Sequence, residues 1–241
     1  KPADVNALHP SLWATSVGRS RDGVLSVGGV SVTDLATQFG TPAYIVDEAD
    51  FRARAAEFVQ TYNEIFEDLC GGADVYYAGK AFLCTEIVRW VTAEGLAVDV
   101  ATGGELAVVL AAGADPARIG VHGNNKSVAE LEQAVEAGAG SIVLDSSIEL
   151  ERLAVIAERR GVVQNVLVRV NSGVHAETHD FLATAHEDQK FGFAMTDAVA
   201  TVARIRELPS LRFIGLHCHI GSQIFGAAGF EESAARMVEL H

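Results

Sequence analysis

The chain has few basic residues and no basic cluster. Its 241 residues include 18 Lys and Arg against 32 Asp and Glu, which gives a formal net charge of −14 at pH 7. A protein that binds the phosphates of nucleic acid gathers Lys and Arg on one face or along one helix. The sequence contains no such gathering, so we expect no nucleic acid partner.

Cysteine is also scarce. The three cysteines, Cys70, Cys84 and Cys218, are an odd number and have no CxxC spacing. This pattern argues against a disulfide framework and against a cysteine zinc site, and it is typical of a reducing cytoplasm. The sequence therefore predicts no metal site.

Long apolar runs are missing as well. No run approaches the roughly 18 residues of a membrane-spanning helix, and the amino-terminal stretch lacks the charged-then-apolar layout of a signal peptide. We expect a cytoplasmic protein with no membrane partner. With 49% hydrophobic residues, the chain is long enough to bury a substantial core in one large domain.

The pattern of elements changes once along the chain, near Asp47. Before that point the signals are of strands and turns, and two apolar segments around Gly28-Gly29 predict a hairpin over residues 24–32. A segment of helical period then runs from 48 to 69 and ends at a glycine pair, as a helix should.

Beyond residue 70, apolar segments rich in Val and Ile alternate with segments of helical period. Capping-box spacings, Thr102 to Glu105 and Ser127 to Glu130, predict two of the helix starts. Such alternation indicates a parallel sheet covered on both faces. We count about six βα units, two short of the eight that close a TIM barrel. The expected strands are 75–77, 97–100, 119–122, 141–144, 166–170 and 213–217.

Polar residues at the carboxyl ends of these strands are the candidate site residues, because the chemistry of such barrels lies there. Each also has an explanation without function. Asp99, Asp145 and Asn171 could cap turns. His217 by itself would be a hydrogen-bonded core histidine. Lys80 follows a small apolar strand, where an amine can lose its proton below the usual pKa of about 10.4, but a lone lysine is more often a surface residue. The full set is Lys80, Asp99, His122, Asn124, Asp145, Arg169, Asn171, His217 and His219.

Seven segments, spread over nearly the whole chain, match the motifs of a known protein family in the same order. They are Gly40-Thr41-Pro42-Ala43-Tyr44, Ala78-Gly79-Lys80-Ala81, Ala101-Thr102-Gly103-Gly104-Glu105-Leu106, Gly123-Asn124-Asn125-Lys126-Ser127, Val168-Arg169-Val170-Asn171, the stretch 178–192 and His219-Ile220-Gly221-Ser222-Gln223. With them the chain resembles the pyridoxal-phosphate-dependent decarboxylases that have an alanine-racemase-like barrel, and among these the enzymes for diaminopimelate. The resemblance implies an incomplete (β/α)8 TIM-like barrel over residues 48–241, preceded by the amino-terminal segment of a flanking β domain over 1–47.

The resemblance also implies a cofactor, pyridoxal 5'-phosphate, and roles for five residues. Lys80 would hold the cofactor through a Schiff base, and His219 would stack on its ring. Ser222, with amides of its turn, would bind the phosphate. Asp99 and Arg169 would lie near the lysine and the ring and tune their protonation. Lys80 and His219 are thus the predicted catalytic residues.

The implied activity is the decarboxylation of meso-2,6-diaminopimelate to L-lysine and CO2 by a complete protein that forms a homodimer. Two later motifs of the family, Glu-Pro-Gly-Arg and Cys-Glu-Ser-Gly-Asp, do not occur in the sequence, so we expect the 241-residue chain alone to be inactive. One alternative is a decarboxylase of ornithine, arginine or lysine. Another is a non-catalytic relative that binds the cofactor. The stretch 186–192 favours diaminopimelate.

Overall fold

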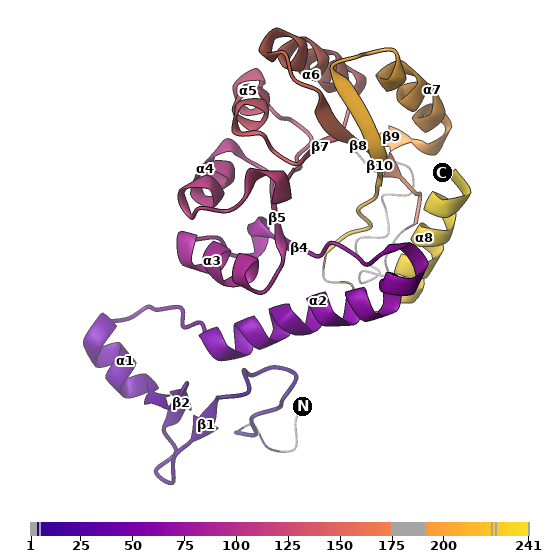
Figure 1. Ribbon diagram of the computed structural model, residues 1–241. Helices are drawn as coiled ribbons and strands as arrows, with labels where there is room; N and C mark the ends of the chain where they lie inside the picture. Colours follow the sequence, from indigo (N-terminus) through magenta and orange to yellow (C-terminus); the bar gives the residue numbers. More distant parts are fainter. Residues whose placement is uncertain (1–3, 5, 175–190, 223, 225, 241) are drawn as a thin grey trace. The chain divides into compact units, whose positions relative to one another are not determined.

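The computed structural model describes residues 4, 6–174, 191–222, 224 and 226–240 (Figure 1). By the density of internal contacts the chain divides into two compact units. One consists of Lys1–Val75 and Trp90–Leu96, and the other of Tyr76–Arg89 and Ala97–His241. The domain boundary after Asp47 stays a prediction from the sequence.

The first unit begins with a small antiparallel sheet. It consists of β1 (Gly18–Arg19), β2 (Leu25–Val27) and β3 (Val30–Ser31). Val27 pairs with Val30 across Gly28 and Gly29, whose φ values of 59° and 82° favour glycine, so the predicted hairpin is confirmed.

A short helix that the sequence analysis did not predict follows the hairpin. Val32, expected in the strand, instead begins α1 (Val32–Phe39). The Ser31 hydroxyl accepts a hydrogen bond from the backbone N–H of Asp34 at 3.1 Å and so caps the helix. The Ser-x-x-Asp spacing was the signal that could have revealed α1.

The long helix α2 (Glu48–Cys70) confirms the helix predicted over 48–69. It ends at Gly71, which adopts the left-handed conformation with φ 83°. Within this unit the ring of Phe51 lies 6.0 Å from that of Trp90, and Arg52 Nε donates to Glu94 at 2.6 Å. These contacts join the segment Trp90–Leu96 to α2.

The second unit is built on six parallel strands in the spatial order β10-β8-β7-β6-β5-β4. Each predicted strand is present, with ends shifted by no more than two residues. No pairing joins β4 to β10 among the described residues, so this sheet is an open part of a barrel, as predicted. A further strand, β9 (Phe193–Ala194), was not predicted and pairs with β8. The six bounds are β4 Tyr76–Ala78, β5 Ala97–Val100, β6 Ile119–Val121, β7 Ser141–Leu144, β8 Gln164–Asn171 and β10 Leu211–His217.

Helices connect these strands, and α4 to α7 lie along the outer side of the sheet (Figure 1). Ser127 and Glu130 form the predicted capping box at the start of α5. At α4 only half of the predicted box forms, because the Glu105 carboxylate accepts from Ala101 N at 2.6 Å instead of from Thr102 N. The bounds are α3 Thr85–Ala93, α4 Gly103–Ala111, α5 Val128–Ala137, α6 Ser147–Arg160, α7 Met195–Arg206 and α8 Ala228–Leu240, with 3-10 turns η1 Gly79–Ala81 and η2 Pro116–Arg118.

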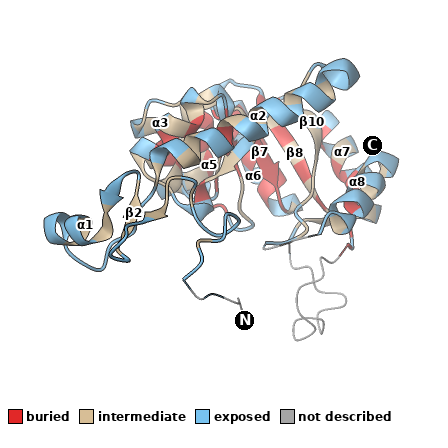
Figure 2. Ribbon diagram, turned by 90° about the horizontal axis from the view of Figure 1, so that it is seen from below, coloured by how far each residue is buried: buried red, intermediate tan, exposed pale blue. Residues whose placement is uncertain are grey.

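Burial alternates along β8 and defines two faces. Val166, Val168 and Val170 are buried in the core with the outer helices, and this part of the core is visible on β7 and β8 in Figure 2. Residues between them, including Arg169, remain partly accessible and point to the opposite face. Among the described residues, no helix is long and apolar enough to cross a membrane.

Candidate active site

Residues in the carboxyl-terminal halves of five strands, or just after them, line most of one pocket of about 600 Å³. The five residues that the sequence analysis assigned to the cofactor are all in this lining. Parallel strands bring their carboxyl ends to the same rim, which is why residues so far apart in the sequence meet here. The five are Lys80, Asp99, Arg169, His219 and Ser222.

Lys80 lies in the turn η1, directly after β4. A Cβ on Gly79 would lie only 2.8 Å from the backbone oxygen of Asp99, so glycine is what lets this turn approach β5. Lys80 itself is exposed. The apolar environment expected from the sequence is therefore not found, because the lysine sits in a turn at the rim and not within the apolar strand.

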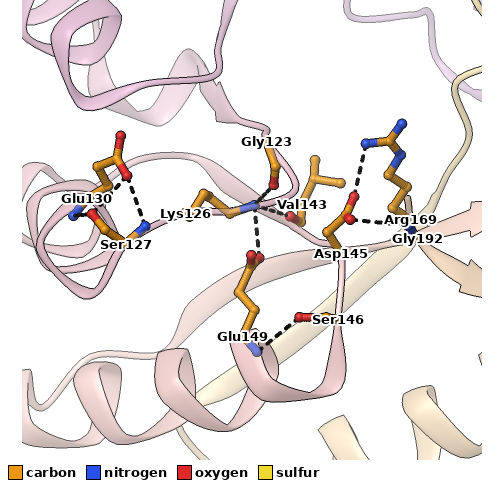
Figure 3. A network of polar contacts seen from close by, with 10 residues as sticks. All are labelled: Gly123, Lys126, Ser127, Glu130, Val143, Asp145, Ser146, Glu149, Arg169 and Gly192. Carbon is orange, nitrogen blue, oxygen red and sulfur yellow. Dashed lines mark hydrogen bonds and ion pairs between the residues drawn. The ribbon is translucent and has the colours of Figure 1, made fainter. Parts of the chain in front are cut away.

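The buried lysine of this region is Lys126, in the loop after β6 (Figure 3). Its Nζ lies 2.9 Å from Glu149 Oε1 and donates to the carbonyl oxygens of Gly123 and Val143. Burial lowers the pKa of Lys126 and raises that of Glu149. Lys126 is not part of the pocket lining, so its amine is held away from the pocket in which Lys80 stands.

Arg169 is held by Asp145, which is buried (Figure 3). Arg169 Nη1 donates to Asp145 Oδ1 at 2.9 Å, and the N–H of Gly192 donates to Oδ2 at 3.1 Å. The guanidinium also lies over the ring of Phe191, 5.2 Å from its centre. Asp145 is thus a partner of Arg169, whereas Asn171 does cap a turn, since its Oδ1 accepts from Gly173 N at 2.9 Å.

Two histidines and a carboxylate form a second polar group in the lining. His122 Nε2 lies 2.8 Å from Asp99 Oδ1, and the His122 ring meets that of His217 edge-on with 4.9 Å between centres. Burial, followed by the charges of His122 and Arg169, lowers the pKa of His217 to about 3. His217 is therefore neutral at pH 7, and its ring packs against His122 in the pocket. The hydrogen bond expected of a core histidine is not found at its Nδ1, which has no partner among the described residues.

His219 and Ser222 follow β10 and reach the pocket from its other end. Partial desolvation, and then the positive charges of Lys80 and Arg169, lower the pKa of His219. Ser222 follows Gly221, whose φ of 136° lies where side-chain-bearing residues are rarely found. Gln223, at the end of this motif, and the predicted loop residues 178–190 lie outside the described residues.

The chemistry of the lining suits an anionic ligand that carries an aldehyde. An amine, a guanidinium, a hydroxyl, three imidazoles and the Asp99 carboxylate line a volume typical of small-molecule sites. Among the described residues, no group of three or more His, Cys, Asp or Glu side chains could hold a metal ion.

A family model described as pyridoxal-dependent decarboxylase, pyridoxal binding domain, matches residues 52–241. The chain belongs to this family. Pyridoxal phosphate is accordingly the cofactor of its domain, and the amine and anion-binding groups of the pocket fit that cofactor.

Within this family, the most similar relatives found are named diaminopimelate decarboxylase. The chain is 52% identical to the diaminopimelate decarboxylase of Mycobacterium leprae over 98% of its own length and 49% of the relative's. It is 45% identical to that of Corynebacterium efficiens, over 98% of the chain and 50% of the relative. The chain spans about half the length of the curated relatives it matches.

A solved structure of a diaminopimelate decarboxylase from M. jannaschii has the same architecture. Its TM-score is 0.84 at 28% identity, covering 94% of this chain and 52% of the other. The same protein was also solved in complex with L-lysine.

The sequence places His122 at a strand end but predicts no role for it, and no motif predicts that Phe191 contacts Arg169. For His122 the position directly after β6 was the available signal. For Phe191 no local signal exists, since its contact depends on how the segment before β9 returns to β8.

Proposed function

We propose that this chain forms the cofactor-binding part of an enzyme that decarboxylates meso-2,6-diaminopimelate to L-lysine and CO2. The observation that carries the proposal is the meeting of Lys80, His219 and Ser222 in one pocket. The names of the curated relatives support the choice of substrate.

In this proposal Lys80 binds the aldehyde carbon of the cofactor through its amine, and His219 stacks on the pyridine ring to set its plane. Ser222 and the amides of the turn at Gly221 bind the phosphate. Asp99 and Arg169 lie beside the lysine and the ring and tune their protonation. When bound, the cofactor supplies an electron sink for the bond pair that remains as the substrate carboxylate leaves.

The exposure of Lys80 is consistent with this role, because a lysine that binds and releases a cofactor must be reachable. Lys126 lacks that freedom, since three acceptors hold its amine in the interior. Orientation is then the main task of the chain's own residues, and Asp145 contributes to it by holding Arg169.

We also infer a homodimer and a cytoplasmic location for the complete protein. The cytoplasmic location is supported by Cys70, Cys84 and Cys218, which are free cysteines. The dimer rests on the family resemblance and is tested by measuring the mass of the complete protein in solution.

The proposal is tested by labelling and by a substrate panel, both with the complete protein. Borohydride treatment should fix the cofactor's mass on the peptide that contains Lys80, and Lys80→Ala should lose the label. His219→Ala should keep the label but retain the cofactor less firmly and turn over about a hundredfold more slowly. Label on Lys126 would contradict the assignment.

The panel compares meso-diaminopimelate with ornithine, arginine and lysine, and CO2 release is measured. We expect release from diaminopimelate that Lys80→Ala abolishes. If CO2 were released faster from another amino acid of the panel, that amino acid would replace diaminopimelate as the proposed substrate. Cofactor binding with no release from any of them would favour the non-catalytic alternative.

A further inference from the structure

The contact between Asp99 and His122 depends on a glycine beneath it. Asp99 on β5 pairs in register with Gly120 on β6, two residues before His122. A Cβ on Gly120 would lie 2.5 Å from Asp99 Oδ1 and 3.6 Å from His122 Nε2. The bare backbone of Gly120 therefore leaves the space through which the carboxylate and the imidazole meet.

The His122 ring also has a contact on the side away from Asp99. Its ring meets His217 edge-on, and His217 Nδ1 is buried with no hydrogen-bond partner in the described part of the chain. His217 is paired in register with Arg169, and its strand continues to His219. His122 thus links the carboxylate on β5 to the strand that leads to the ring-stacking residue.

The pair formed by His122 and Asp99 adds little to the stability of the core. The side chains of His122 and Asp99 are 27% and 28% exposed, whereas the buried core of this unit lies around residues such as Val166 and Leu150. Partly exposed ion pairs add little to stability. The contact between His122 and Asp99 is short and depends on Gly120, yet it adds little to stability. Its effect on the direction of the Asp99 carboxylate explains it better than a contribution to stability does.

Resting on the proposed function, we propose that His122 is a positioning residue, which holds the Asp99 carboxylate in one direction beside the cofactor. His122 Nε2–H donates to Asp99 Oδ1, and the edge contact with His217 keeps the imidazole from turning away. His122 acts through Asp99 and needs no contact with the cofactor.

Two variants of His122 distinguish the effect of its hydrogen-bond donor from the effect of its ring. His122→Phe keeps a ring against His217 but removes the donor, and His122→Gln keeps an amide donor. We measure the dissociation constants of pyridoxal phosphate, and of pyridoxine phosphate, which cannot react with Lys80, by titration of the complete protein. Loss of a hydrogen bond to a charged group predicts binding about tenfold weaker or more in the Phe variant, and recovery to within a few-fold in the Gln variant.

A double-mutant cycle asks whether the effect passes through Asp99. If it does, His122→Phe combined with Asp99→Asn should bind no more weakly than Asp99→Asn alone. Gly120→Ala should weaken binding in the same direction with His122 intact, because its Cβ displaces the carboxylate. His9→Phe, at an exposed histidine in the other unit, is the matched control and should bind normally.

The outcomes are distinct. Additive losses in the double variant, or unchanged binding in both His122→Phe and Gly120→Ala, would overturn the positioning role while leaving the proposed function intact. A wild-type protein that binds neither ligand would overturn both. Should His122→Phe fail to fold, His122→Gln and Gly120→Ala carry the test, and normal binding by Gly120→Ala then overturns the inference.

Discussion

At the scale of single residues, the ion pairs of this chain differ widely in how far they are buried. The side chains of Lys126 and Glu149 are 2% and 6% exposed, whereas those of Arg204 and Glu151 are 44% and 51% exposed. Exposed pairs contribute about 0–1 kcal/mol. In a buried pair the mutual attraction must offset the desolvation of both charges, so the loss of one partner is costly. Lys126 and Glu149 together hold the loop that carries Gly123 at the pocket.

We predict opposite pH trends for the two halves of this buried pair. Lys126→Met should lower the free energy of unfolding by about 3–5 kcal/mol near neutral pH, because Glu149 is left buried without its partner. The Glu149 pKa is raised above its usual 4.5, so at pH values between 4.5 and the folded pKa the folded state binds a proton that the unfolded chain releases. The loss should therefore grow as the pH rises above about 4.5 and shrink as the pH falls toward that value.

Glu149→Gln should behave in the reverse way. The Lys126 pKa is lowered below its usual 10.5, so at pH values between the folded pKa and 10.5 the unfolded chain binds more protons. Stability of this variant should rise with pH through that window. Urea unfolding at several pH values measures both trends, and Arg204→Met is the exposed control, with a loss of about 1 kcal/mol or less. Parallel pH trends in the two buried variants would contradict this account.

At the scale of elements, the close approach of η2 to the start of β7 depends on Gly140. Its N–H donates to the carbonyl oxygen of Pro116 at 2.9 Å, and a Cβ at this position would lie 2.0 Å from the carbonyl oxygen of Ala117. The obstacle is backbone, which cannot rotate away as the end of a side chain can. A glycine is thus required here for space.

We predict that Gly140→Ala destabilises the fold by about 1–3 kcal/mol or more, the usual range for overpacking. Gly226→Ala is the matched control, because a Cβ there would meet nothing within 4 Å. Thermal or urea unfolding compares the two variants with the wild type. Equal stability of both variants would mean that the turn at Ala117 moves aside easily.

At the scale of the whole molecule, β10 ends the parallel sheet, because in the described part of the chain it pairs with β8 on one side and with no strand on the other. Unpaired backbone groups along a strand edge attract other chains. Ile214 on β10 is 49% exposed and adds an apolar side chain to that edge.

We therefore predict that the 241-residue chain, prepared by itself, associates as its concentration rises. Sedimentation velocity over a range of concentrations measures this. Ile214→Lys should reduce association, since a charge on an edge strand opposes pairing. A monodisperse monomer at every concentration would refute the prediction.

Much of the fold follows from local sequence signals. Alternating apolar strands and helices, the glycine pair at Gly28 and Gly29, and the capping box at Ser127 each depend on neighbours in sequence, so the elements they predict are present. The carboxyl-end rule also selected the pocket residues Lys80, Asp99, Arg169 and His219. Signals of this kind need no knowledge of how distant strands pair.

The partners of those residues could not be predicted in the same way. Which lysine is buried, which carboxylate holds Arg169, and which imidazole meets Asp99 all depend on strand register and on the space left by glycines on neighbouring strands. The sequence alone determined the order of elements and the rim on which the site stands, because those depend on local periodicity. Only the tertiary structure decided how the charges around the pocket pair, because the pairs Lys126–Glu149, Asp145–Arg169 and Asp99–His122 each join segments that meet only when the sheet assembles.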